Sequence, residues 1–393
     1  MATSTQTPEQ RELALIGKVE LRIALADSAP KLEAILKTYL APLLLKLSSE
    51  HVDVRNKLIS ICQHISTRIK PQSIQLPVAA LIKQFKDQES PLVRHFDLLY
   101  LQQGVDRLSA RDKAELLPVL VGGISKSGSQ GSQIFNLLLR LLESFTLPPR
   151  GSKEDLGMRQ QFEVTDHDAS YLASWLGKFI LFVPQKGTAT TCPGLNAEDF
   201  AFINLQGKEN PWSPSAGSLN LPRTKVLAAR LLSSGLFNDH ERFLPALFAS
   251  ADPASTISDV GDDILKRALP VTDLEGETLV SKLFSLYFGE AGAPRVRASL
   301  RLKILGLLNK STHSTTFSHH IMRMVDDGVA TPAVDGEDVV MSNAPARYVS
   351  FLLRAYQDSV LSLRRVHAVT GPCTEVLMTR ANKCTVMPAS AAR

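Results

Sequence analysis

A recurring phrase constrains most strongly what this chain can fold into. The phrase is an apolar stripe at helical spacing, a short polar turn, and a Val-Arg pair that opens a second apolar stripe. The pair occurs as Val54-Arg55, as Val93-Arg94 and as Val296-Arg297, each time after an apolar, leucine-bearing segment. Because neither helix of such a pair can bury its own apolar face, neighbouring pairs must stack on one another. The sequence therefore predicts an all-α protein, a HEAT-type α-solenoid of stacked antiparallel helix pairs.

The spacing of the phrase supports the HEAT class. Arg55 and Arg94 are 39 residues apart, and Arg297 lies 36 residues after Gly261, which takes the equivalent place in a third, weaker copy. HEAT repeats run to roughly 40–47 residues and vary in length. Since the copy at Gly261 has lost its arginine, the exact number of repeats stays open.

Breaks in the helical periodicity divide the chain into five predicted segments. They are N-terminal HEAT-repeat helices over 1–147, a linker with an apolar helix over 148–184, an irregular Pro- and Gly-rich insertion over 185–222, further repeat helices over 223–365, and an aperiodic tail over 366–393. The tail lacks a face that could pack, so we expect it to be disordered or a mispredicted end. A Gly- and Ser-rich linker at 122–132 is expected to be mobile.

Start and stop signals place the individual helices. A capping box, Thr7-Pro8-Glu9-Gln10, predicts a helix to about Ala26, and others begin at Ser109 and Thr165. Further helices are expected at about 224–232, 241–249, 260–268, 279–288, 294–308 and 347–363.

Composition excludes several classes of function. Apolar residues make up 44% of the chain and charged residues 21%, as in ordinary soluble proteins. The net charge of +5 is spread over single basic residues, so nucleic-acid binding is not expected. The most apolar stretch, 171–183, is too short to span a bilayer, and the N-terminus does not resemble a secretory signal. Four unpaired cysteines fit a reducing compartment, so we expect a soluble, intracellular protein.

No motif in the chain predicts catalysis, a cofactor or a metal site. Neither a phosphate-binding loop nor a nucleophile elbow is present. The adjacent His319-His320 would point about 100° apart on a helix, so we interpret them as a polar helix segment. We interpret Asp166-His167-Asp168 as a helix cap rather than an acid-base cluster. Trp212, in the insertion, could anchor a partner or pack the insertion onto the helices.

The arginines of the phrase have two possible roles. Each valine should face inward, and each arginine should lie at the turn inside a repeat, where it can donate to carbonyls or to an acid such as Asp53. Alternatively, Arg55, Arg94 and Arg297 contact a partner. We favour the structural role because stacking alone explains it, so the partner-binding residues remain unknown at this stage.

The flanks of the first copy add a family resemblance. Leu44-Leu45-Lys46-Leu47-Ser48-Ser49 and Ile74-Gln75-Leu76-Pro77-Val78 resemble the N-terminal repeats of the large HEAT-repeat proteasome adapter and scaffold family. Further segments are similar in order: Ser234-Gly235-Leu236-Phe237, Ala249-Ser250-Ala251-Asp252, and Val296-Arg297 leading to Leu302-Lys303-Ile304. The resemblance covers roughly residues 10–363.

The resemblance implies a non-enzymatic adapter that binds proteasome core-particle and regulatory-cap subunits and bridges or stabilises them. It implies no small-molecule substrate, nucleic acid or inserted membrane segment, and with it we expect a cytoplasmic and nuclear location. Members of the family are several times longer, so we expect this chain to be an N-terminal fragment. Two alternatives stay open. One is a HEAT scaffold of another class, such as a nuclear transport receptor or phosphatase scaffold, and the other is an enzyme hidden in a helical domain.

Overall fold

The computed structural model describes residues 7–71, 73–184, 190–205, 212, 219–290, 292–329 and 350–357. In the helix that ends at 329, the side chains are described only as far as residue 324. These residues divide into two compact units. Unit 1 comprises Met1–Phe179 and Ala201–Arg242, and unit 2 comprises Ile180–Phe200 and Phe243–Arg393. The boundaries of the units cut across the five segments predicted from the sequence. The predicted tail at 366–393 lies outside the described residues.

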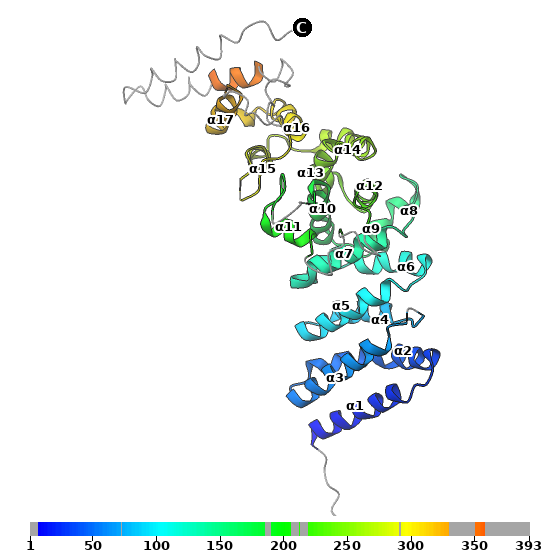
Figure 1. The fold of residues 1–393 in the computed structure, drawn as a ribbon. Helices are drawn as coiled ribbons and strands as arrows, with labels where there is room; N and C mark the ends of the chain where they lie inside the picture. The colour runs from blue at the N-terminus through cyan, green and yellow to red at the C-terminus, as the bar shows by residue number, and fades with distance from the viewer. Residues whose placement is uncertain are drawn as a thin grey trace, which may run out of the picture. The chain divides into compact units, whose positions relative to one another are not determined.

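Unit 1 is built almost entirely from helices (Figure 1). They are α1 (Pro8–Ala24), α2 (Ala29–Leu45), η1 (Lys46–Ser48), α3 (Val52–Arg68), α4 (Val78–Asp87), α5 (Pro91–Val105), α6 (Ala110–Val121), η2 (Ile124–Gln130), α7 (Gly131–Leu142), α8 (Lys153–Leu156), α9 (Met158–Gln161), most of α10 (Asp166–Leu181) and α12 (Leu221–Leu232). Described residues of both units contain only one isolated bridge, Cys192–Leu195, and no strand. The all-α HEAT-type prediction is confirmed.

Local signals in the sequence explain where these helices begin. Thr7 and Gln10 form the predicted reciprocal capping box of α1, with Pro8 in the first turn. The Ser109 hydroxyl accepts a hydrogen bond from the Asp112 amide at the start of α6, at 3.2 Å. Such caps satisfy amides that have no partner inside the helix.

The helices of unit 1 pack in consecutive layers. Helix α1 packs on α2 and α3, α2 packs on α4 and α5, and α5 packs in turn on α7 (Figure 1). The valines that precede the repeated arginines, Val54 and Val93, are fully buried, as the stacking model predicts. The linker at 122–132 differs from its prediction, because 124–130 forms the helical turns of η2 and α7 begins at Gly131.

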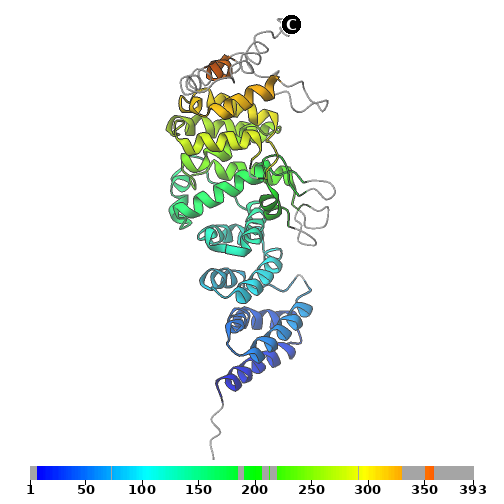
Figure 2. The same ribbon diagram turned by 90° about the vertical axis from the view of Figure 1, so that its left-hand side faces the viewer.

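Unit 2 continues with further helices (Figure 2). They are most of α13 (Asp239–Ser250), α14 (Ser255–Ala268), η4 (Leu269–Val271), α15 (Glu277–Phe288), α16 (Ala298–Leu308), η5 (His313–Thr316), α17 (Ser318–Val329) and residues 350–357. Helix α15 packs on α16 and η5. Of the helix predicted at 347–363, only 350–357 is described, and it is helical.

Glycine determines how closely α13 and α14 approach each other in unit 2. A Cβ on Gly261 would lie 2.3 Å from the backbone nitrogen of Ser250 and 2.7 Å from the carbonyl carbon of Ala249. Real Cβ contacts are longer than this, so only glycine permits the observed contact. The position that has lost its arginine is therefore a direct contact between helix backbones.

Two further predictions of local structure were wrong. The helix expected at 294–308 begins only at Ala298, and Arg297 is its N-cap residue. The insertion at 185–222 is not irregular throughout, because it contains α11 (Ala197–Ile203). The Asn196 side chain caps this helix by accepting a hydrogen bond from the Asp199 amide at 2.8 Å. The sequence Asn196-Ala197-Glu198-Asp199 is a recognisable helix start, but it was not predicted as one because Pro and Gly residues surround it.

Candidate functional site

Two of the three repeated arginines bind backbone carbonyls in unit 1. Arg55 donates through Nη1 to the carbonyls of Ser49 at 2.6 Å and Glu50 at 3.1 Å, closing the turn before its own helix. The acceptors are carbonyls rather than the carboxylate of Asp53. Arg94 donates through Nη2 to the carbonyls of Ser127 at 2.9 Å and Lys126 at 3.2 Å, so it joins α5 to η2. Both arginines thus serve the fold itself.

Arg297, in unit 2, behaves differently. It is exposed and precedes α16, whereas Arg55 and Arg94 are each the fourth residue of their helix. Val296 is nevertheless buried. The three Val-Arg pairs therefore share an inward valine, but their arginines do not occupy one structural position.

Two arginines outside the phrase also bridge successive helix pairs in unit 1. Arg68, at the end of α3, donates to the carbonyls of Ile23 and Ala26 near the end of α1. Arg107, just after α5, donates to the carbonyls of Ile69 at 2.7 Å and Ile74 at 2.9 Å, beyond the end of α3. Helix C-termini leave carbonyls without partners, and a guanidinium can satisfy several at once. These bridges could not be predicted from the sequence because their acceptors are backbone atoms 33–45 residues away.

A groove of about 520 Å³ lies in unit 1 beside Arg94. Its lining comes from α4, α5, the end of α6, η2 and the 161–168 region. The charged residues that line it are Lys86, Asp87, Arg94, Lys126, Glu163 and Asp168. Apolar residues, among them Phe85, Ile124 and Phe162, form much of the remainder.

Three of the charged groups at this groove are already engaged in holding helices together. The Arg94 guanidinium lies 4.4 Å from the centre of the Phe85 ring in addition to its carbonyl contacts. Lys86 donates to the carbonyl of Val119, and burial lowers its pKa. Asp168 accepts hydrogen bonds from the Ser125 amide at 3.0 Å and hydroxyl at 2.7 Å. Nucleophilic catalysis would place a nucleophile within hydrogen-bonding distance of a base. The contacts of these three groups instead join one segment of the fold to another.

Asp168 also caps its own helix, as the sequence predicted. Its amide donates to the Thr165 hydroxyl at 3.1 Å, and the Thr165 amide donates back to the carboxylate at 3.2 Å. Burial raises the pKa of Asp168, but the hydrogen bonds from Thr165 and Ser125 outweigh it and lower the pKa to about 2. The carboxylate therefore stays ionised and fixes η2 against α10.

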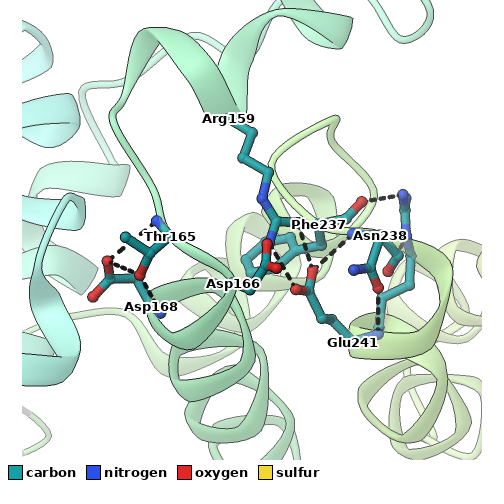
Figure 3. A network of polar contacts seen from close by, with 8 residues as sticks. Arg159, Thr165, Asp166, Asp168, Phe237, Asn238 and Glu241 are labelled. Carbon is teal, nitrogen blue, oxygen red and sulfur yellow. Dashed lines mark hydrogen bonds and ion pairs between the residues drawn. The ribbon is translucent and has the colours of Figure 1, made fainter.

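Figure 3 shows a second polar network, in which Arg159 and Glu241 point toward each other. Arg159 donates to both carboxylate oxygens of Glu241, at 3.0 and 2.9 Å, and to Asp166 at 2.6 Å. Glu241 also accepts from the Asn238 amide at 2.8 Å, and its own amide donates to the Asn238 side chain at 2.9 Å. The pair joins α9 to the start of α13 within unit 1, which makes it a structural bridge.

Trp212, for which the sequence left two roles open, packs against neighbouring residues within unit 1. Its ring stacks on that of Phe179, with centroids 5.4 Å apart, and its Nε1 donates to the carbonyl of Ile203 at 3.1 Å. Phe202, from α11, stacks on Trp175 with an angle of 10° between the rings. These contacts favour the packing role, and Phe202 was missed because α11 was not predicted.

The His319-His320 pair lies at the start of α17 in unit 2. The His320 ring contacts Phe284, with centroids 4.9 Å apart, and burial lowers its pKa. Within the described part of the chain, no three His, Cys, Asp or Glu residues gather as a metal site would require. The described helices also include none that is both long and apolar enough to cross a membrane.

The fold and its polar contacts define the class of the protein. Helix pairs stack in layers, arginines and glycines join neighbouring helices, and three of the charged groups at the groove take part in such contacts. Such a molecule is a HEAT-type helical-repeat protein.

Comparison with known proteins gives the family. The model for "Proteasome component ECM29, N-terminal" matches residues 16–364, so the chain belongs to the ECM29 family. It is 32% identical over 336 residues to "Proteasome component ECM29" of Saccharomyces cerevisiae, 28% over 293 residues to "Proteasome-associated protein ECM29 homolog" of Drosophila melanogaster, and 25% over 314 residues to "Proteasome adapter and scaffold protein ECM29" of Homo sapiens. No solved structure gives a significant match.

These relatives are much longer than the chain. The matches cover 80%, 72% and 74% of this chain, but only 18%, 15% and 17% of the yeast, fly and human proteins respectively. The chain therefore corresponds to less than a fifth of each relative's length. The resemblance inferred from the sequence is confirmed by the family match.

Proposed function

We propose that this chain is a non-enzymatic adapter and scaffold that binds the proteasome and helps to bridge or stabilise its core particle and regulatory cap. The observation that carries the proposal is the family match over residues 16–364. The names of the yeast and human relatives, a proteasome component and a proteasome adapter and scaffold protein, support it. The same match favours a proteasome adapter over a nuclear transport receptor or a phosphatase scaffold.

The charged groups support the non-enzymatic part of the proposal. Arg94, Lys86 and Asp168 lie at the groove in unit 1, and each binds a neighbouring segment of the fold. Stacked helix pairs offer extended surfaces for protein partners rather than enclosed reaction chambers. A protein that acts on proteasomes would work where they occur, so the proposal places it in the cytoplasm and the nucleus.

Binding to purified particles tests the proposal. The whole chain, fluorescently labelled, is mixed with purified core particle, purified regulatory cap and the assembled holoenzyme, and each mixture is run on a native gel. We expect the label to migrate with at least one particle and most strongly with the assembled holoenzyme. An unrelated HEAT-repeat protein of similar size is the control. Migration of the label as free chain in all three mixtures would overturn the proposal.

A further inference from the structure

The outer face of α1 in unit 1 carries an unusual combination of side chains. Large apolar side chains are exposed there: Leu15 and Leu21 each retain 59% of their accessible surface, and Leu25, which follows the helix, retains 71%. Three exposed basic residues lie on the same side, of which Arg22 also donates to the hydroxyl of Tyr39 in α2. This outer face comprises Arg11, Leu15, Lys18, Leu21, Arg22 and Leu25.

Helical geometry brings the six residues together. At 100° per residue they fall within an arc of about 120°, opposite the buried Ile16 and Ile23. Single exposed leucines are ordinary on a protein surface. Here three exposed leucines share one helix face with three cations, and exposed apolar side chains gathered on one face are typical of interaction sites.

The acidic residues of α1 point away from this outer face. Glu12 binds Lys46 at 2.6 Å and the Ser49 hydroxyl at 2.7 Å, toward α2 and η1. Glu20 binds Lys57 of α3 at 2.6 Å. Glu9 lies in the first turn, where the helix dipole favours a negative charge, and it is also outside the arc. The outer face is thus positive, with no carboxylate of its own helix to neutralise it.

We propose that the outer face of α1 is a docking surface for an acidic amphipathic segment of a partner protein. Carboxylates of the segment would pair with Arg11 and Lys18, while its apolar side chains would cover Leu15, Leu21 and Leu25. Charge complementarity of this kind steers association and selects partners, and apolar contacts slow dissociation. The inference concerns the chemistry of the partner and does not depend on the proteasome being that partner.

Other occupants fit the face less well. A second copy of the chain would place the same cations opposite one another, and like charges in an interface are costly. A helix that lies on a bilayer separates an apolar face from its flanking cations. Here Lys18 lies in the middle of the arc, between Leu15 and Leu21, so lipid insertion would bury a charge.

An unbiased peptide selection tests the proposal. A displayed library of random helical peptides is selected on the whole chain, and each recovered peptide is then assayed on the variant Arg11→Glu/Lys18→Glu/Leu21→Ser/Leu25→Ser. We expect the recovered peptides to carry Asp or Glu beside apolar residues at i, i+3 and i+4 spacing. Their Kd should rise by about tenfold or more in the variant, since interface anchors are commonly worth more than 1 kcal/mol each. Added salt should also weaken binding of the peptides to the unchanged chain, because it screens the exposed charges.

A control variant tests whether the effect is specific to the outer face of α1. The variant Lys83→Glu/Lys266→Glu/Leu156→Ser changes exposed residues of the same types on other helices and should leave the Kd unchanged. Carbodiimide coupling should join Lys18 to a peptide carboxylate. Recovery of neutral or basic peptides, equal binding to the α1 variant, or binding of phosphatidylserine vesicles through these residues in place of peptide would each overturn the proposal.

Discussion

Helices α5 and α14 occupy comparable places in their units but are held by opposite means. In α5, Arg94 reaches across to the carbonyls of Lys126 and Ser127, so a long side chain fills the space between segments. In α14, Gly261 removes the side chain altogether and lets the helix rest on the backbone at Ala249 and Ser250. Loss of the arginine from the repeated phrase is therefore a change in the kind of joint rather than decay of the repeat.

The residues three positions further on extend the contrast. Asp97 lies three residues after Arg94, and Ile264 lies three residues after Gly261. Both side chains are fully buried, but the first is an acid and the second is apolar. The Gln84 side chain donates to one Asp97 oxygen at 3.0 Å, and the described residues offer the other oxygen no donor. The arginine-bridged pair thus tolerates a buried polar group where the glycine-packed pair has an apolar one.

The largest expected effect comes from closing the glycine contact. Gly261→Ala places a Cβ 2.3 Å from the Ser250 nitrogen, so α14 must shift as a whole. We expect a loss of about 3 kcal/mol in the free energy of unfolding, as for other overpacked cores. Urea unfolding followed by circular dichroism measures it.

Gly17→Ala is the matched control for this substitution. Gly17 lies inside α1, and nothing lies within 4 Å of its Cβ position. Alanine there should stabilise the helix by about 0.5–1 kcal/mol. Equal effects of the two substitutions would show that α14 does not depend on a close backbone contact.

The next effect concerns the pH dependence of the arginine-bridged pair. Burial raises the pKa of Asp97 to about 7, although the hydrogen bond from Gln84 opposes the shift. An acid with a raised pKa in the folded state favours folding while it is protonated, so stability should fall as pH rises from about 4 to 7. Asp97→Asn should remove this part of the pH dependence and stabilise the protein at pH 8 by on the order of 2 kcal/mol. Thermal unfolding at pH 5 and pH 8 compares the two proteins, and an unchanged pH profile in the variant would contradict the assignment.

A smaller effect is expected from removing the arginine bridge itself. Arg94→Ala takes away two hydrogen bonds to carbonyls and the contact with the Phe85 ring. We expect a loss of about 1–2 kcal/mol, because the carbonyls at η2 lose their donor. Arg94→Lys keeps the charge but not the planar set of donors, so it should recover only part of the loss. Full recovery by lysine would mean that charge alone matters at this joint.

The smallest effect should come from the third arginine of the phrase. Arg297 is exposed at the N-cap of α16, and Arg297→Ala should change the free energy of unfolding by no more than about 0.5 kcal/mol. Urea unfolding of Arg297→Ala beside Arg94→Ala gives the comparison directly. A loss as large as that of Arg94→Ala would restore the view that the repeated arginines are equivalent.

Much of the architecture could be predicted because its signals are local. The predicted helix caps are present at Thr7, Ser109 and Thr165. The two valines predicted to face inward, Val54 and Val93, are buried. Helix α11 escaped prediction because it is short and surrounded by turn residues. Of the candidate sites, the caps were recognisable, but the partners of Trp212 and Arg159 lie in distant segments of unit 1.

The sequence by itself determined that the chain is helical, where most helices begin, and which family it resembles. Helical periodicity and capping depend on residues three or four positions apart, so both can be recognised in the amino-acid sequence. Only the tertiary structure decided that Arg94 and Arg107 satisfy distant carbonyls, that Gly261 makes a backbone contact, and that α1 keeps a positive, leucine-bearing face exposed. Each of these depends on which other segment of the chain lies against the residue, or on no segment doing so, and only the packing of the folded chain decides that.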